Sequence, residues 1–179
     1  MALFWRQGYA ATSIADLVAH LGIARASLYG TFGSKHDLYV AALERYIQSG
    51  KPNVIEVLAT PGPVLPAVEA LLRGSAAAPP PEAPPGCMVV NAAVECPADD
   101  VVVRRRLDLN WESVEVALTS ALLRARAQRE IRAEVDVASL ARFLLVLMQG
   151  IQVVSESEGG ARRAEAAVTH ALGVLQSAR

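Results

Sequence analysis

The chain has 179 residues, of which 53% are hydrophobic, 20% are charged and 5% are aromatic. This composition supplies an aliphatic core of ordinary size and excludes global disorder. The formal net charge of −1 excludes a polycationic binder of the histone kind, although it leaves room for a local nucleic-acid-binding face.

Cysteine content and hydropathy indicate the cellular compartment of the protein. Two cysteines are too few for a secreted disulfide framework, and residues 1–9 lack the apolar run of a signal peptide. The most apolar stretch, Phe143 to Met148, has six residues, whereas a bilayer span needs about 20. We expect a soluble, cytoplasmic protein without a membrane partner.

The first 49 residues are predicted to form a small helical module. The expected helices cover residues 12–21, where apolar positions recur three and four residues apart, then residues 24–31 and residues 35–49. Thr12 or Ser13 can cap the first segment, and Gly22 suits the left-handed residue that commonly ends a helix. Two short helices joined by a tight glycine turn have the form of a helix-turn-helix.

Residues 50–179 are predicted to form a larger helical body. The expected helices cover residues 54–59, 64–73, 87–95, about 100–128, 137–157 and 161–176. Five prolines between residues 78 and 86 exclude an ordinary helix there and predict an extended loop. No strand-period alternation persists for more than a few residues, so the fold class is all-α.

An ordered set of residues in the N-terminal module matches a known pattern. The set is Phe4, Gly8-Tyr9, Thr12-Ser13-Ile14, Gly22-Ile23, Leu28-Tyr29, Phe32, Ser34-Lys35 and Leu38. In this set the module resembles the TetR/AcrR family of bacterial transcriptional regulators. A helix pair with a glycine turn alone is common in proteins that bind no nucleic acid, but the ordered Tyr-x-x-Phe and Ser-Lys are specific.

The resemblance implies a DNA-binding role for a set of polar and small residues. They are Thr12, Ser13, Arg25, Ala26, Ser27, Tyr29, Thr31 and Lys35. Thr12 and Ser13 are expected near phosphate, and Tyr29 and Lys35 match positions that hold phosphates. Arg25 at the start of the recognition helix can read guanine or bind phosphate.

The module departs from the family pattern at several positions. Many relatives carry Ser where this chain has Ala24, so the recognition helix lacks a side-chain cap. Gly30 weakens that helix by about 1 kcal/mol relative to Ala. The family's first helix normally begins well before Phe4, so we expect that this helix is truncated at its start and that DNA binding is weakened.

By the same resemblance, residues 1–49 form the DNA-binding domain and residues 50–179 form a ligand-binding and dimerisation domain. A Gly-Cys-x-x-x-Asn segment at Gly86 is found in some relatives. The candidate ligand-binding residues are Cys87, Met88, Asn91, Trp111, Phe143, Met148 and Gln152. Simple core packing is the alternative reading for Cys87 and for Trp111. A leucine-rich stripe over 140–154 fits a dimer interface or an intramolecular core.

These observations predict a homodimeric repressor that binds a palindromic operator and releases it when a small, mostly apolar effector binds. Activation in place of repression stays open. His20, His36 and His170 are scattered without metal-spaced partners, and no phosphate loop or nucleophile elbow occurs. We therefore expect no enzymatic activity, no cofactor and no metal. The alternative function is that of a helical small-molecule-binding protein that has lost specific DNA binding.

Overall fold

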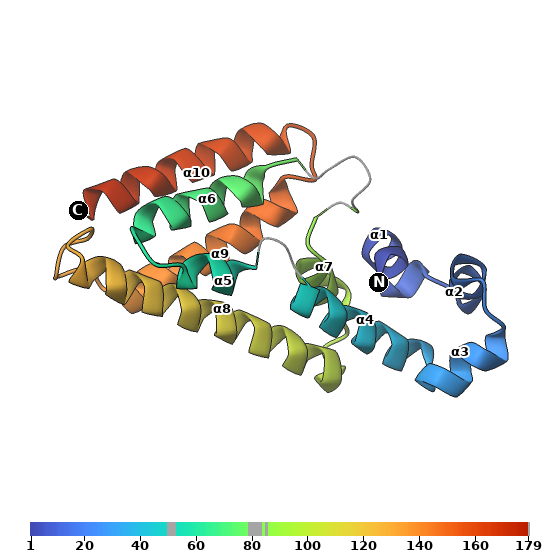
Figure 1. Ribbon diagram of the computed structural model, residues 1–179. Helices are drawn as coiled ribbons and strands as arrows, with labels where there is room; N and C mark the ends of the chain where they lie inside the picture. The colour runs from blue at the N-terminus through green and yellow to red at the C-terminus, as the bar shows by residue number, and fades with distance from the viewer. Residues whose placement is uncertain (50–52, 79–83, 85, 179) are drawn as a thin grey trace. The chain divides into compact units, whose positions relative to one another are not determined.

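The computed structural model describes residues 1–49, 53–78, 84 and 86–178, and these residues form helices and loops without any strand (Figure 1). The all-α prediction is confirmed, and the predicted helices are present with small shifts at their ends. Most of the expected loop over 78–86 lies outside the described residues. Packing divides the chain into two compact units, which are described separately below.

The first unit combines Met1–Gly50 with Pro81–Asp108. Its helices are α1 (Ala2–Ala11), α2 (Ile14–Leu21), α3 (Arg25–Phe32), α4 (Lys35–Ser49), α7 (Met88–Glu95) and the beginning of α8 (Val101–Ala127). α7 packs against α1 and α4, so the segment after the proline-rich region belongs to the same compact unit as the helix-turn-helix. The functional boundary expected after residue 49 stays a prediction. The two compact units are defined by packing, and packing does not show which residues bind DNA and which bind a ligand.

The helix ends in this unit follow the local sequence. The Ser13 hydroxyl accepts the N–H of Asp16, whose carboxylate accepts the N–H of Ser13, which completes a capping box at α2. Gly22 ends α2 in the left-handed conformation, with φ of 65°. Ala24 precedes α3 without a side-chain cap, as expected. The Ser34 hydroxyl caps α4 by accepting the N–H of Asp37 at 3.0 Å.

The second unit combines Lys51–Pro80 with Leu109–Arg179. It holds α5 (Val54–Ala59), α6 (Val64–Ala76), the remainder of α8, α9 (Val137–Val154) and α10 (Gly160–Ser177). The helices α6, α9 and α10 lie side by side and pack on one another (Figure 1). The Glu130 carboxylate accepts the N–H groups of Val64 and Leu65, which satisfies orphan donors at the start of α6.

The leucine-rich stripe of α9 lies mainly in this unit's own core. The buried members of the stripe are Leu140, Leu144, Met148 and Ile151. Of the two alternatives for the stripe, the intramolecular core holds for these four residues, because side chains of the same chain already cover them. By length and composition alone, α9 is also apolar enough to cross a membrane. Its packing against α6 and α10 accounts for that composition, since core helices of soluble proteins share it.

Candidate nucleic-acid interface

Helix α3 separates a buried residue from an exposed polar surface. Leu28 is fully buried and fixes the helix to its own unit. The residues exposed on α3 include Arg25, Ala26, Ser27, Tyr29 and Thr31. An exposed short helix that carries these groups has the form of a recognition helix, since side chains on such a helix can reach base edges and phosphates in the major groove.

Arg25 and Tyr29 interact one helical turn apart. Arg25 Nη2 donates to the Tyr29 hydroxyl at 3.5 Å, and the guanidinium carbon lies 5.6 Å from the centroid of the Tyr29 ring. The contact restrains the long arginine side chain. Because the Tyr29 hydroxyl accepts from Arg25, its own hydrogen stays available to donate to a phosphate oxygen.

Lys35 lies at the first position of α4 and is restrained by an aromatic ring. Its Nζ is 4.4 Å from the centroid of the Tyr9 ring. A cation above a ring face is attracted by about 0.5–1 kcal/mol at partly exposed sites. The ammonium group is therefore held beside the Tyr9 ring.

In the structure the hydroxyls of Thr12 and Ser13 are engaged within the first unit, Ser13 as the expected cap of α2. Thr12 is fully buried, and its hydroxyl donates to the carbonyl oxygen of Gly8 at 2.6 Å. Ser13 is exposed, but its hydroxyl donates to the Asp16 carboxylate at 2.6 Å. The side-chain and backbone hydrogen bonds from Ser13 lower the pKa of Asp16, so a negative charge stands beside Ser13. Neither hydroxyl is free to donate to phosphate in this conformation.

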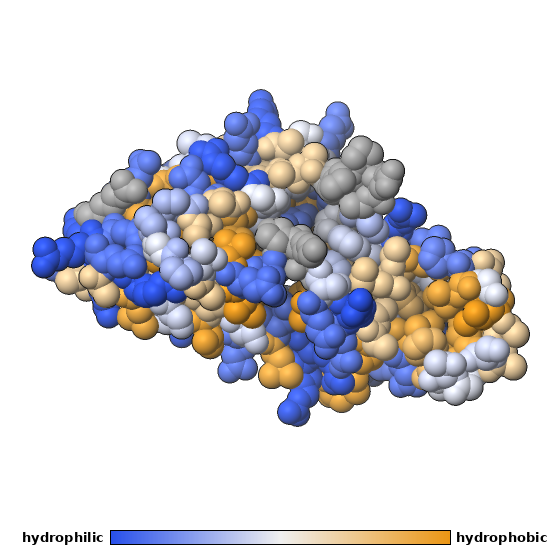
Figure 2. Space-filling view, viewed as in Figure 1, coloured by the Kyte–Doolittle hydropathy of each residue, from blue (hydrophilic) through white to orange (hydrophobic). Residues whose placement is uncertain are grey.

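The surface over α2 and α3 is mixed rather than uniformly basic. Apolar residues gather there in the space-filling view (Figure 2), and Leu21 at the end of α2 is among the exposed ones. Ala26 adds a small apolar group that can contact a thymine methyl. This surface therefore combines a few cationic groups with exposed apolar ones.

An aromatic cluster supports the interface from within the first unit. Phe4, Leu17 and Leu28 are buried in this unit, whereas Tyr9, Ile14 and Phe32 are half-buried. The sequence reasoning missed Tyr39, whose ring lies 5.2 Å from Phe4 and 4.8 Å from Tyr9. Burial, and then the charge of Glu95, raises the pKa of Tyr39, which stays neutral at neutral pH.

The candidate ligand residues of the first unit lie on and just before α7. Tyr46 donates to the Cys87 sulfur at 3.5 Å, and the Trp5 indole N–H donates to the carbonyl of Gly86 at 3.2 Å. Met88 is buried and Asn91 is half-buried. Burial, followed by the charge of Cys87, raises the pKa of Tyr46 well above its usual range. Sequence reasoning missed the Tyr46 contact because the two residues are far apart in the chain.

The remaining ligand candidates lie in the second unit. The Trp111 indole N–H donates to the Gln149 side-chain oxygen at 3.4 Å, a partner that the sequence did not single out. Met148 is buried, and Gln152 is half-buried one turn beyond Gln149. Phe143 is 42% exposed. Phe143 and Met148 thus lie on different faces of α9 and do not form one site.

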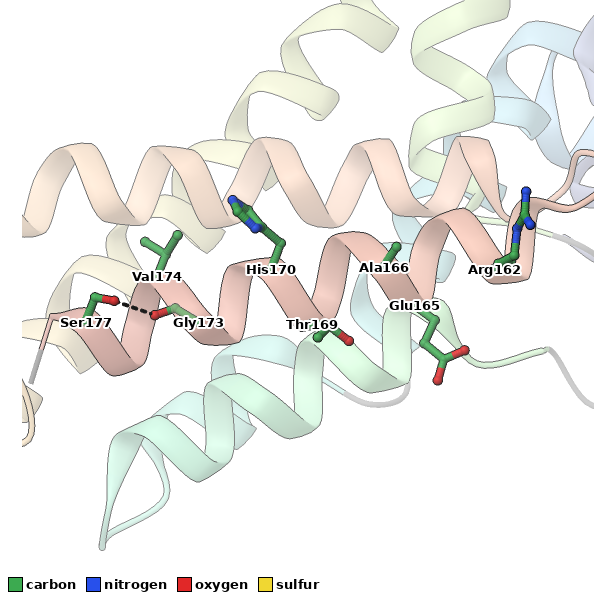
Figure 3. Close-up of a pocket in the computed structure, with 8 residues that line it drawn as sticks. All are labelled: Arg162, Glu165, Ala166, Thr169, His170, Gly173, Val174 and Ser177. Carbon is green, nitrogen blue, oxygen red and sulfur yellow. Dashed lines mark hydrogen bonds between the residues drawn. The ribbon is translucent and has the colours of Figure 1, made fainter.

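The second unit also has an open groove along α10 (Figure 3). Its lining residues are Arg162, Glu165, Ala166, Thr169, His170, Gly173, Val174 and Ser177. They recur every three or four residues and so form one face of the helix. The small residues among them allow another chain to approach the backbone closely.

Comparison with known proteins identifies the family. A family model described as "Bacterial regulatory proteins, tetR family" matches residues 1–42. A second, described as "Tetracyclin repressor-like, C-terminal domain", matches residues 55–171. The chain belongs to the TetR family. It is a transcriptional regulator, and DNA is the class of partner that this membership indicates.

Individual relatives agree with this assignment. The uncharacterized HTH-type transcriptional regulator YezE of Bacillus subtilis (strain 168) is 38% identical over 144 residues, which cover 79% of this chain and 74% of YezE. The HTH-type transcriptional repressor ComR of Escherichia coli (strain K12) is 32% identical over 164 residues, covering 89% and 76%. A cysteine mutant of the TetR-family regulator CifR, complexed with 26-bp double-strand operator DNA, is 29% identical with a TM-score of 0.84, covering 96% and 90%.

Proposed function

We propose that this TetR-family regulator is a homodimeric, cytoplasmic repressor that binds a palindromic operator. A small, mostly apolar effector releases it. The observation that carries the proposal is the exposed polar surface of α3, fixed from beneath by buried Leu28. The repressor name of ComR and the operator complex of CifR support it. No enzymatic step is part of the proposal.

Arg25 is proposed to read a base or to bind phosphate, and Ala26, Ser27 and Thr31 to face the groove. Tyr29 and Lys35 are proposed to bind phosphates. Thr12 and Ser13 are assigned to positioning the chain between α1 and α2, because their hydroxyls are engaged within the unit.

The DNA-binding proposal is tested by selection from a random-duplex library, followed by competition titrations. We expect the retained duplexes to converge on one palindrome that is bound far more tightly than unrelated DNA. A library that fails to converge, with equal affinity for every duplex, would favour the alternative function as a small-molecule-binding protein.

The effector proposal rests on polar groups set among apolar residues. In the second unit these are Trp111, Gln149 and Gln152, and in the first unit Cys87 and Asn91 offer a separate candidate. The chain has two tryptophans, so Trp5→Phe leaves Trp111 as the only reporter. An apolar compound that dissociates the operator complex should also change the Trp111 fluorescence if it binds in the second unit.

The homodimer proposal rests on exposed surface of the second unit. The open groove along α10 has small residues, and α9 exposes Phe143, Val146 and Val153 on one face. A palindromic site requires a twofold partner, so a second copy of this chain is the occupant that fits these surfaces.

A further inference from the structure

Helix α1 is broken at Gly8, directly against the end of α7. Gly8 has φ of 78° and ψ of 172°, values that interrupt the helical hydrogen-bond ladder. The N–H of the next residue, Tyr9, donates instead to Glu95 Oε2 at 2.8 Å. The Tyr9 N–H at the break thus has a carboxylate partner from a distant part of the sequence.

The contact between Gly8 and Glu95 leaves no room for a side chain. A Cβ added at Gly8 would collide with the Glu95 carboxylate, and the positive φ disfavours other residues as well. Glycine therefore permits both the break and the close approach. The carboxylate lies against the chain at the point where α1 leads into the capping box of α2.

Tyr9 links Glu95 to Lys35, a residue of the predicted DNA surface. Its backbone is held by Glu95, while its ring lies under the Lys35 ammonium at 4.4 Å. The same ring packs against Tyr39, at 4.8 Å, and edge-on to His36, at 6.2 Å. A shift of the Tyr9 backbone would therefore move the surface on which Lys35 rests.

Two further contacts join the segment around α7 and early α8 to α4. His36 Nε2 lies 2.8 Å from Asp100 Oδ2, and Arg106 Nε lies 2.8 Å from Glu44 Oε1. They hold the segment next to the helix that begins with Lys35. Glu95 thus acts from a segment whose position relative to α4 is already fixed.

We propose that Glu95 is a positioning residue for operator binding: its carboxylate holds the Tyr9 backbone so that the Tyr9 ring places the Lys35 ammonium on a DNA phosphate. This inference rests on the proposed function, because it assumes an operator complex in which Lys35 binds phosphate. It adds a residue of α7, outside the helix-turn-helix, to the determinants of phosphate contact.

The test is the salt dependence of operator affinity, measured on the full chain with the selected palindrome. Log affinity falls linearly as log salt rises, and the magnitude of this decline is called the slope below. Each lost phosphate contact lowers that magnitude by about 0.9. Lys35→Ala should lower the slope by that amount for each bound protomer. Glu95→Ala should lower it equally, and adding Glu95→Ala to Lys35→Ala should lower it no further.

Controls separate positioning from charge and from folding. Asp99→Ala removes one negative charge from the same unit and should leave the slope unchanged. Glu95→Gln keeps an oxygen that accepts the Tyr9 N–H and should restore the wild-type slope. Glu95→Asp keeps the charge but shortens the reach, so it should lower the slope even if Glu95→Ala folds poorly.

A wild-type slope in both Glu95→Ala and Glu95→Asp, with a lowered slope in Lys35→Ala, would overturn the inference and leave operator binding intact. An unchanged slope in Lys35→Ala would overturn the inference as well, because it would show that Lys35 binds no phosphate. Failure of the wild-type chain to prefer any duplex would instead reject the proposed function.

Discussion

At the scale of single residues, Arg25 and Tyr29, which are proposed to recognise DNA in two different ways, contact each other. A guanidinium can read a base edge, whereas a phenol at this position is expected to hold phosphate. Their contact at 3.5 Å restrains both side chains before DNA binds. The resemblance to the TetR/AcrR family implied these roles, but the contact between the two side chains is visible only in the structure.

We predict that Arg25→Ala relaxes the preference at one base pair of each half-site, at a cost of about 1–3 kcal/mol for the preferred operator. Competition titrations against single-base operator variants measure this effect. Tyr29→Phe should instead weaken binding to all variants by a similar factor. An Arg25→Ala protein that keeps the complete preference profile would remove the base-reading role.

The residue scale also shows which contacts sequence patterns do not reveal. Thr12 and Ser13 match the family pattern, yet the structure uses their hydroxyls inside the unit. The Thr12 hydroxyl donates to the carbonyl of Gly8, the residue at which α1 is broken, and periodicity does not reveal this break. The contact of Glu95 with Tyr9 was missed for a related reason, because the two residues are 86 positions apart in the sequence.

At the scale of elements, α3 is a short helix with weak local determinants. It lacks a side-chain cap at Ala24 and contains Gly30, so packing of Leu28 has to stabilise it. The sequence predicted the helices well because their caps, glycines and apolar spacing are local signals. It could not predict that α7 packs with the helix-turn-helix, since this packing depends on residues far apart in the chain.

Gly30→Ala is expected to stabilise the protein by about 0.5–1 kcal/mol, seen as a higher midpoint in chemical denaturation. A Cβ at Gly30 meets no atom within 4 Å, so the gain in helix propensity carries no steric cost. Gly8→Ala is the matched control and should destabilise, because its Cβ meets Glu95. Equal effects of the two substitutions would contradict this account of the helices.

The link between α4 and α8 should show a defined pH dependence. Burial alone would raise the pKa of Asp100, but hydrogen bonds from the Val103 N–H and His36, together with attraction to His36, lower it. A lowered folded-state pKa gives stability that is present above the unfolded pKa of about 3.9 and is lost as pH falls through the folded value.

We therefore predict that Asp100→Asn is less stable than the wild type at neutral pH. The difference should shrink as pH falls below about 4, when the wild-type carboxyl becomes protonated. Denaturation midpoints of both proteins over a pH series measure it. A difference that stays constant down to the lowest pH would exclude an ionised Asp100 as its source.

At the scale of the whole molecule, the proposed regulator needs two copies of the chain. Composition predicted a helix-rich core, but hydrophobicity alone could not separate that core from an interface. Most of the α9 stripe proved to be core, and the exposed apolar residues of α9 lie on a different face. Which apolar face is buried depends on how α6, α9 and α10 pack, which helical periodicity does not specify.

Val146→Glu is expected to convert the dimer to a monomer, measured by light scattering during size-exclusion chromatography. Val146 is 70% exposed on α9, so a charge there leaves the intramolecular core intact but opposes burial against a partner. Val116→Glu is the control, since Val116 is 60% exposed on α8 and has no assigned interface. Dimers of unchanged stability in Val146→Glu would place the interface elsewhere.

The central claim is specific recognition of a palindrome by a dimer. Its most direct test is a fluorescence-anisotropy titration of the full chain against the selected operator and against the same operator with about five base pairs inserted between its half-sites, which rotates them by half a turn. The account predicts tight, competitor-resistant binding of one dimer to the first duplex and severe loss on the second. Equal binding to both duplexes and to unrelated DNA would contradict it.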